Sequence, residues 1–143
     1  MLFHKLNHND EGLAWAELGY AENNLGRKSE ARRHLAEALQ AARRIKAPQT
    51  MVVSLAHLAA ILADSKPEQA VELYTLACRH PYVGSSHLWK DLLLPEIASA
   101  AACLPPAVVK AAKTRAEEED WEKAAENWLE KLRTDQPVDR SAL

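Results

Sequence analysis

Two histidines, His4 and His8, have the spacing most suggestive of chemistry, because they stand four positions apart. On a helix this spacing places both imidazoles on one face, where they could chelate a metal ion. Zinc sites generally need at least three protein ligands, and no third ligand accompanies this pair. Cys78 and Cys103 show no CxxC or Cys/His spacing, which is typical of reduced, buried thiols. We therefore predict no metal site and no cofactor.

Catalysis would require a recognisable arrangement of nucleophile, base and acid, or a loop that holds phosphate. The chain contains no Walker loop and no G-x-G-x-x-G, G-x-S-x-G or H-E-x-x-H motif. Glu17, Tyr20 and His57 could act together across a groove, but no two of them have a recognised nucleophile–base arrangement. We predict that the chain is not an enzyme, with an unrecognised site at these three residues as the alternative.

The charge distribution gives little support for nucleic acid or a membrane as partner. The net charge is -2, whereas binders of these anions usually carry a basic excess. A basic stripe runs from Arg27 to Lys46, but lysines and arginines also suit a helix C-terminus, and no aromatic residues are interleaved for base stacking. No apolar run approaches a membrane span, and Met1 to Lys5 lack the order of a secretory signal. We expect a cytoplasmic protein whose partner is another protein.

The elements that must position these residues are helices. The chain has 143 residues, suits one domain, and is rich in apolar residues at helical spacing. We predict about seven helices, the first beginning after Asn9 and Asp10, and no strands. Ser65 and Glu68 around Pro67 have the spacing of a capping box, and Asp120 can cap the last helix. The predicted helices are separated by glycines and prolines, which are Gly26, Pro48, Pro67, Pro81, Gly84, Pro105 and Pro106.

The predicted helices form tandem antiparallel hairpins. Only residues 26–28 connect the first two helices, so these must fold back on each other. A shift of about forty residues superposes Trp15 on Leu55 and Leu18 on Leu58, which is typical of a helical repeat. The segment Trp15-x-x-Leu18-Gly19, followed by Gly26, Ala31, Leu35 and Ala38, resembles the tetratricopeptide pattern.

This resemblance implies an α-solenoid in which Trp15 and Leu18 lie in the core and Gly19, Ala31 and Ala38 allow close helix packing. Glu22 stands where the family usually has an aromatic residue. The long units resemble the C-terminal repeats of large bacterial signalling ATPases and transcription regulators, which implies either a fragment of such a protein or a standalone copy.

The predicted organisation is one helical-repeat domain over residues 1–143. Its last helices, with Trp121 and Trp128 on one face, should cap the open end of the stack. The segments are a remnant of a preceding repeat helix (1–8), repeat 1 (9–47), repeat 2 (48–81), a degenerate repeat with capping helices (82–133) and a flexible tail (134–143).

Recognition is expected on the concave surface, which the first helix of each pair forms in tetratricopeptide arrays. The resemblance implies a scaffold that binds a partner peptide or helix in this groove, as the sensor part of a larger signalling protein. Self-association through an apolar N-terminal edge at Leu2 and Phe3 is the alternative. By register the groove contains Leu13, Ala16, Glu17, Tyr20, Asn23, Asn24, Val53, Ala56, His57 and Ala60, with Asp64 at its end.

Overall fold

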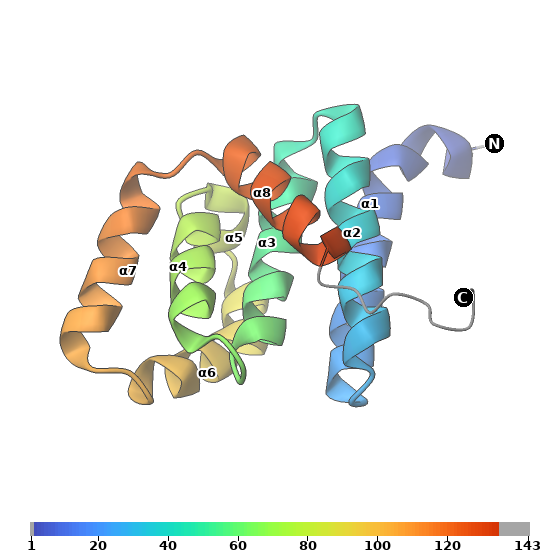
Figure 1. Ribbon diagram of the computed structural model, residues 1–143. Helices are drawn as coiled ribbons and strands as arrows, with labels where there is room; N and C mark the ends of the chain where they lie inside the picture. Colours follow the sequence, from blue (N-terminus) through green and yellow to red (C-terminus); the bar gives the residue numbers. More distant parts are fainter. Residues whose placement is uncertain (1, 135–143) are drawn as a thin grey trace.

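The computed structural model describes the backbone of residues 2–134, and the side chains of residues 11–88 and 90–134 within it. These residues form eight α-helices and no strand, which confirms the all-α class. None of the helices in this part of the chain is both long and apolar enough to cross a membrane. The helices are α1 (Leu2–Asn24), α2 (Lys28–Ile45), α3 (Pro48–Leu62), α4 (Pro67–Cys78), α5 (Pro81–Gly84), α6 (His87–Ala102), α7 (Pro106–Glu118) and α8 (Trp121–Thr134) (Figure 1).

One predicted boundary and the predicted number of helices differ from the structure. The predicted start of the first helix after Asn9 and Asp10 is wrong, because α1 is one helix from Leu2 to Asn24. Polar residues are tolerated on the exposed turns of a helix, so a residue suited to capping does not force an end. The predicted division between residues 1–8 and 9–47 therefore falls inside a continuous helix. The predicted tail beyond Thr134 lies outside the described residues. The extra helix is α5, which begins at Pro81.

The first two helices approach each other closely because small residues line their contact. A Cβ atom added at Gly19 would stand 3.0 Å from the carbonyl oxygen of Ala31 and 3.2 Å from Cγ of Leu35. Ala31, Leu35 and Ala38 are all fully buried. The expectation that Gly19, Ala31 and Ala38 permit close packing is confirmed. The turn between the helices uses Gly26, whose φ of 81° is readily adopted only by glycine.

The predicted core position of Leu18 is wrong. Gly12, Ala16 and Gly19 are buried on the inner side of α1, so Leu18 points away from it and is 42% exposed. Trp15 is half-buried and stacks on His34, with ring centroids 5.1 Å apart. Glu22 is buried and pairs with Nδ1 of His34.

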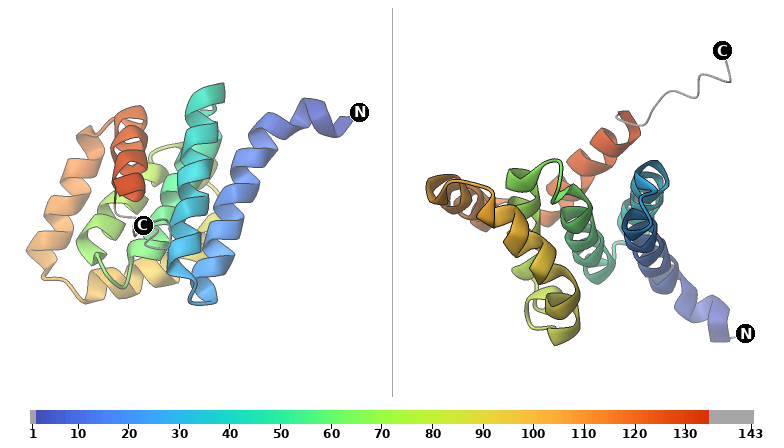
Figure 2. Two further views of the ribbon diagram at one scale, coloured as in Figure 1. Left: turned by 45° about the vertical axis from the view of Figure 1, so that its right-hand side comes forward. Right: turned by 90° about the horizontal axis from the view of Figure 1, so that it is seen from below.

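The helices are arranged around α3, which packs against α1 and α2 on one side and α4 on the other. Seen from below in Figure 2, α6 and α8 lie on opposite sides of α3. The short α5 also contacts α3 and α4, and α7 lies against α4 at the far end of the molecule. The arrangement therefore encloses α3 with helices from both the N-terminal and the C-terminal parts of the chain.

The predicted role of the last helix as an end cap is wrong, because α8 turns back over α2 and α3. Its inner face buries Trp128, Leu129 and Leu132, and Arg133 donates to Oε1 of Gln40 on α2 at 2.5 Å. The terminal position is taken by α7. This helix is tied to α4 by Arg115, which donates to Glu68 and Glu72 at 2.8 and 2.7 Å.

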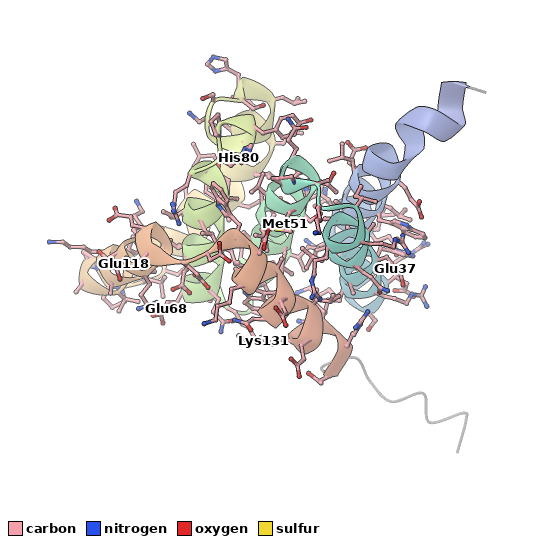
Figure 3. All side chains as sticks on the ribbon, turned by 90° about the horizontal axis from the view of Figure 1, so that it is seen from above. Glu37, Met51, Glu68, His80, Glu118 and Lys131 are labelled. Atoms are coloured by element: carbon pink, nitrogen blue, oxygen red, sulfur yellow. The ribbon has the colours of Figure 1, made fainter. Side chains whose placement is uncertain are left out.

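Replacing Ala38 by arginine tests the packing of α1 on α2. Ala38 is 0% exposed, so A38R would bury a charge without a partner and should destabilise the fold by roughly 3 kcal/mol or more. The matched control is Glu37→Arg, since Glu37 is the exposed neighbour labelled on α2 in Figure 3. Urea unfolding measures both, and the control should change stability by less than about 0.5 kcal/mol. Equal effects of the two substitutions would show that this side of α2 is not in the core.

Candidate functional site

The predicted groove is closed along α3. Val53, Ala56, His57 and Ala60 are at most 3% exposed, and α5 and α6 pack against this helix. The prediction of an open concave surface is therefore wrong at Val53, Ala56 and His57, whereas Ala60 lines an open cleft described below. The physical reason is that α6, which follows the second hairpin, occupies the space where a partner helix was expected.

The inner side of α6 resembles a bound amphipathic helix. Leu93, Ile97 and Ala100 are spaced by four and three residues and are all buried. Such spacing places them on one face of the helix, as in helix-in-groove recognition. The chain thus supplies its own occupant for the groove that its two hairpins would otherwise leave open.

Tyr20 joins α1 to α6 instead of lining an open surface. Its hydroxyl donates to the carbonyl oxygen of Leu92 and lies within 3.3 Å of Oε1 of Glu96. Its ring is tilted against the ring of His57, with centroids 5.2 Å apart. Leu13 is also half-buried and Ala16 is fully buried, so these positions are packed inside the molecule.

An open cleft of about 480 Å³ lies where the turns of both hairpins meet the C-terminal half of α6. It keeps Asn23, Asn24 and Ala60 of the predicted groove, together with Asp64, whereas Glu17 is exposed but does not line it. Sequence reasoning missed the contributions of α2, α4 and α6. The full lining is Asn23, Asn24, Lys28, Ala60, Ala63, Asp64, Pro67, Glu96, Ser99, Ala100 and Cys103.

The cleft combines a floor of small apolar groups with polar groups from several helix ends. Ala60 and Ala100 are nearly buried, while Asn24, Lys28 and Asp64 are exposed. Amide side chains both donate and accept hydrogen bonds, which suits them to a peptide backbone. No local pattern predicts this assembly, because it depends on how α6 is placed. The polar residues Asn23, Asn24 and Asp64 at the ends of the first helices were the available signal.

The cleft carries a surplus of negative charge. Burial raises the pKa of Glu96, the hydrogen bond from Tyr20 lowers it, and the nearby charge of Asp64 raises it further. Two carboxylates therefore face one ammonium group, that of Lys28. A cationic group entering the cleft would favour the ionised form of Glu96.

Glu17, Tyr20 and His57, the residues of the alternative catalytic site, do not meet at an open surface. His57 is 1% exposed, and Tyr20 separates it from solvent on one side by direct ring contact. Among the described side chains no group of three or more His, Cys, Asp or Glu residues is placed to hold a metal. The side chains of His4 and His8 lie outside the described part. Cys78 is half-buried, but the predicted burial of Cys103 is wrong because it is exposed.

Comparison with known proteins adds no relative: no family model, no curated protein and no solved structure matches this chain. The cleft and the packing of the helices are therefore the basis for any functional assignment.

The buried His57 should make stability depend on pH. Burial lowers its pKa to about 4, from 6.5 in the unfolded chain, so the unfolded state binds more protons between these values. The free energy of unfolding therefore has its full value above pH 6.5 as far as this histidine is concerned. It falls by roughly 3 kcal/mol in total as the pH drops towards 4. Urea unfolding at several pH values should show this loss in the parent and a flatter profile in His57→Leu.

The control for this measurement is His87→Leu, because His87 lies at the exposed start of α6. It should keep the pH profile of the parent. An unchanged acid-side slope in His57→Leu would mean that other groups cause the destabilisation.

Proposed function

We propose that this chain is a cytoplasmic protein-interaction module of the tetratricopeptide type that binds a short extended segment of a partner protein. The observation that carries the proposal is the open cleft, where Asn23 and Asn24 meet Asp64 and Glu96 above an alanine floor. The sequence resemblance to tetratricopeptide repeats supports the scaffold role. The resemblance to the repeat regions of bacterial signalling ATPases and transcription regulators supports a sensor role within a larger protein.

An extended segment fits the chemistry of the cleft better than a helix does. The backbone of an extended peptide presents free N–H and C=O groups, whereas a helix has satisfied its own. Asn23 and Asn24 can pair with both kinds of group. The floor formed by Ala60, Ala63 and Ala100 leaves room for one apolar side chain of the partner to be buried.

The charges of the cleft favour a segment with a basic residue. Asp64 comes from the turn between α3 and α4, Glu96 comes from α6, and both line the cleft, so a lysine or arginine of the partner could lie between them. Pairing with a cation would lower the pKa of Glu96, because it would offset the desolvation and the repulsion from Asp64 that raise this pKa. Lys28, at the opposite hairpin turn, would suit an acidic group elsewhere in the segment.

Selection from a displayed library of random linear peptides tests this function. Peptides that bind the native chain should be enriched in lysine and arginine. Their affinity, measured by titration, should fall about tenfold or more for Asn24→Ala combined with Asp64→Ala, because two polar partners are lost. Both residues are exposed, and the variant loses only the hydrogen bond between Asn24 and Tyr20, so its stability should stay within about 1 kcal/mol of the parent.

The matched control is Arg33→Ala combined with Glu37→Ala on the exposed side of α2. It changes the same number of residues and also removes one carboxylate, but it leaves the cleft intact. Peptides that bind the cleft variant normally and fail on this control would refute the cleft and favour the basic stripe as the recognition surface. Failure to select any peptide would refute the proposed function.

A further inference from the structure

The outer side of α1 is an exposed apolar stripe. It lies opposite the buried Gly12, Ala16 and Gly19, and its residues follow helical spacing along the solvent face. Leu18 is 42% exposed and Leu25 is 70% exposed, and exposed apolar residues that form one contiguous patch often mark an interaction site. Two carboxylates, Glu11 and Glu17, flank it. The α1 stripe consists of Ala14, Leu18 and Ala21 on α1 and of Leu25 directly after its end.

A shallow apolar groove lies at the other end of the molecule, between α6 and α7. Its volume is about 830 Å³. Ala98, Ala101, Leu104 and Val109 form its apolar wall. The charged residues that line it are Lys110, Lys113 and Glu117, which gives the groove a surplus of positive charge. We call this surface the α6–α7 groove.

The helix that carries the stripe, α1, and the helix that forms one wall of the groove, α7, lie at opposite ends of the molecule (Figure 2). In Figure 3, Glu37 marks the end formed by α1 and α2, and Glu118 marks the end formed by α7. Figure 2 shows the same order from below, with α1 and α7 outermost. An association between unlike surfaces of identical chains is heterologous, and it propagates unless the geometry closes into a ring.

We infer that a second copy of this chain docks its α1 stripe into the α6–α7 groove, so that copies associate head to tail. The groove would bury the side chains of Leu18 and Leu25 away from water, and the small side chains of Ala14 and Ala21 would let the helices approach closely. The carboxylates beside the stripe would meet the lysines of the groove.

A symmetric pairing of two α1 stripes fits less well. It would bring the flanking Glu11 and Glu17 of both copies to the same interface, where like charges disfavour association. It would also leave the α6–α7 groove uncovered at both ends. The charge complementarity between the stripe and the groove therefore favours the head-to-tail arrangement.

Sedimentation of the whole chain over a wide range of concentration provides the test. The native chain should gain mass with concentration and pass beyond a dimer, since each added copy leaves one free stripe and one free groove. The stripe variant is Leu18→Gln combined with Leu25→Gln, and the groove variant is Ala98→Glu combined with Lys113→Glu. Each should associate about tenfold or more weakly by itself. All four positions are exposed, so both variants should melt like the parent.

Mixing the two variants gives the decisive measurement. Each variant keeps one intact surface, so an equimolar mixture should form a dimer that grows no further. Association of the groove variant at the native level would show symmetric pairing of stripes and overturn the inference. A mixture that stays monomeric, or a native chain that stays monomeric at every concentration, would also overturn it.

A second pair of variants guards against damage to the fold. Glu17→Lys and Lys113→Glu change exposed charges only. Each alone should weaken association, and the chain that carries both should recover it because the opposite charges still meet. Failure of the double variant to recover, with an unchanged melting temperature, would count against this docking.

Discussion

The arrangement of the molecule depends on the need to enclose α3, a helix that has no polar face. Thirteen consecutive residues, from Thr50 to Leu62, are buried. A helix that is apolar on all sides cannot leave any side in water, so it must be surrounded. The two hairpins cover α3 with α1, α2 and α4, and α6 and α8 also pack against it. The few polar groups on α3 are accommodated locally, as when Ser54 donates to the carbonyl oxygen of Thr50 at 2.7 Å.

This constraint also explains where an open site is left. Enclosure is required only along the apolar length of α3, and it ends where the chain becomes polar at Asp64. At that point α1 ends at Asn24, α2 begins at Lys28 and α4 begins at Pro67. The cleft is therefore lined by helix ends, whose polar side chains do not need to be packed inside. The site and the core are consequences of the same distribution of apolar residues along α3.

Local features of the fold could be predicted from the sequence, whereas the contacts between distant helices could not. Pro48, Pro67, Pro81 and Pro106 each stand in the first turn of a helix, and Asp120 accepts a hydrogen bond from the backbone of Lys123. These are effects of neighbouring residues. The predicted capping box at Ser65 is wrong, because the N-cap residue of α4 is Lys66, and it makes no side-chain cap hydrogen bond. Here Pro67 already fixes the start of the helix and its missing N–H needs no partner.

The placement of α6 was beyond local patterns, although the sequence held a signal for it. Between Met51 and Leu62 only Ser54 and His57 are polar, so α3 could not have served as the exposed wall of a groove. The core position predicted for Leu18 follows from the repeat pattern, which does not consider the small residues of the same helix. The position of Leu18 opposite Gly12, Ala16 and Gly19 places it on the solvent side, since the small residues mark the side of close packing.

The energy of α6 docking decides between a partner helix in the groove and a segment in the cleft. Burial of Leu93 and Ile97 stabilises the docked α6 by roughly 4 kcal/mol, with a smaller contribution from Ala100. The contacts of the Tyr20 hydroxyl, at 3.3 Å, add little. A partner helix would have to displace α6, which would weaken its apparent affinity by a factor on the order of a thousand. A segment that enters the cleft displaces only water and keeps the enclosure of α3 intact, so the cleft is the more accessible of the two places.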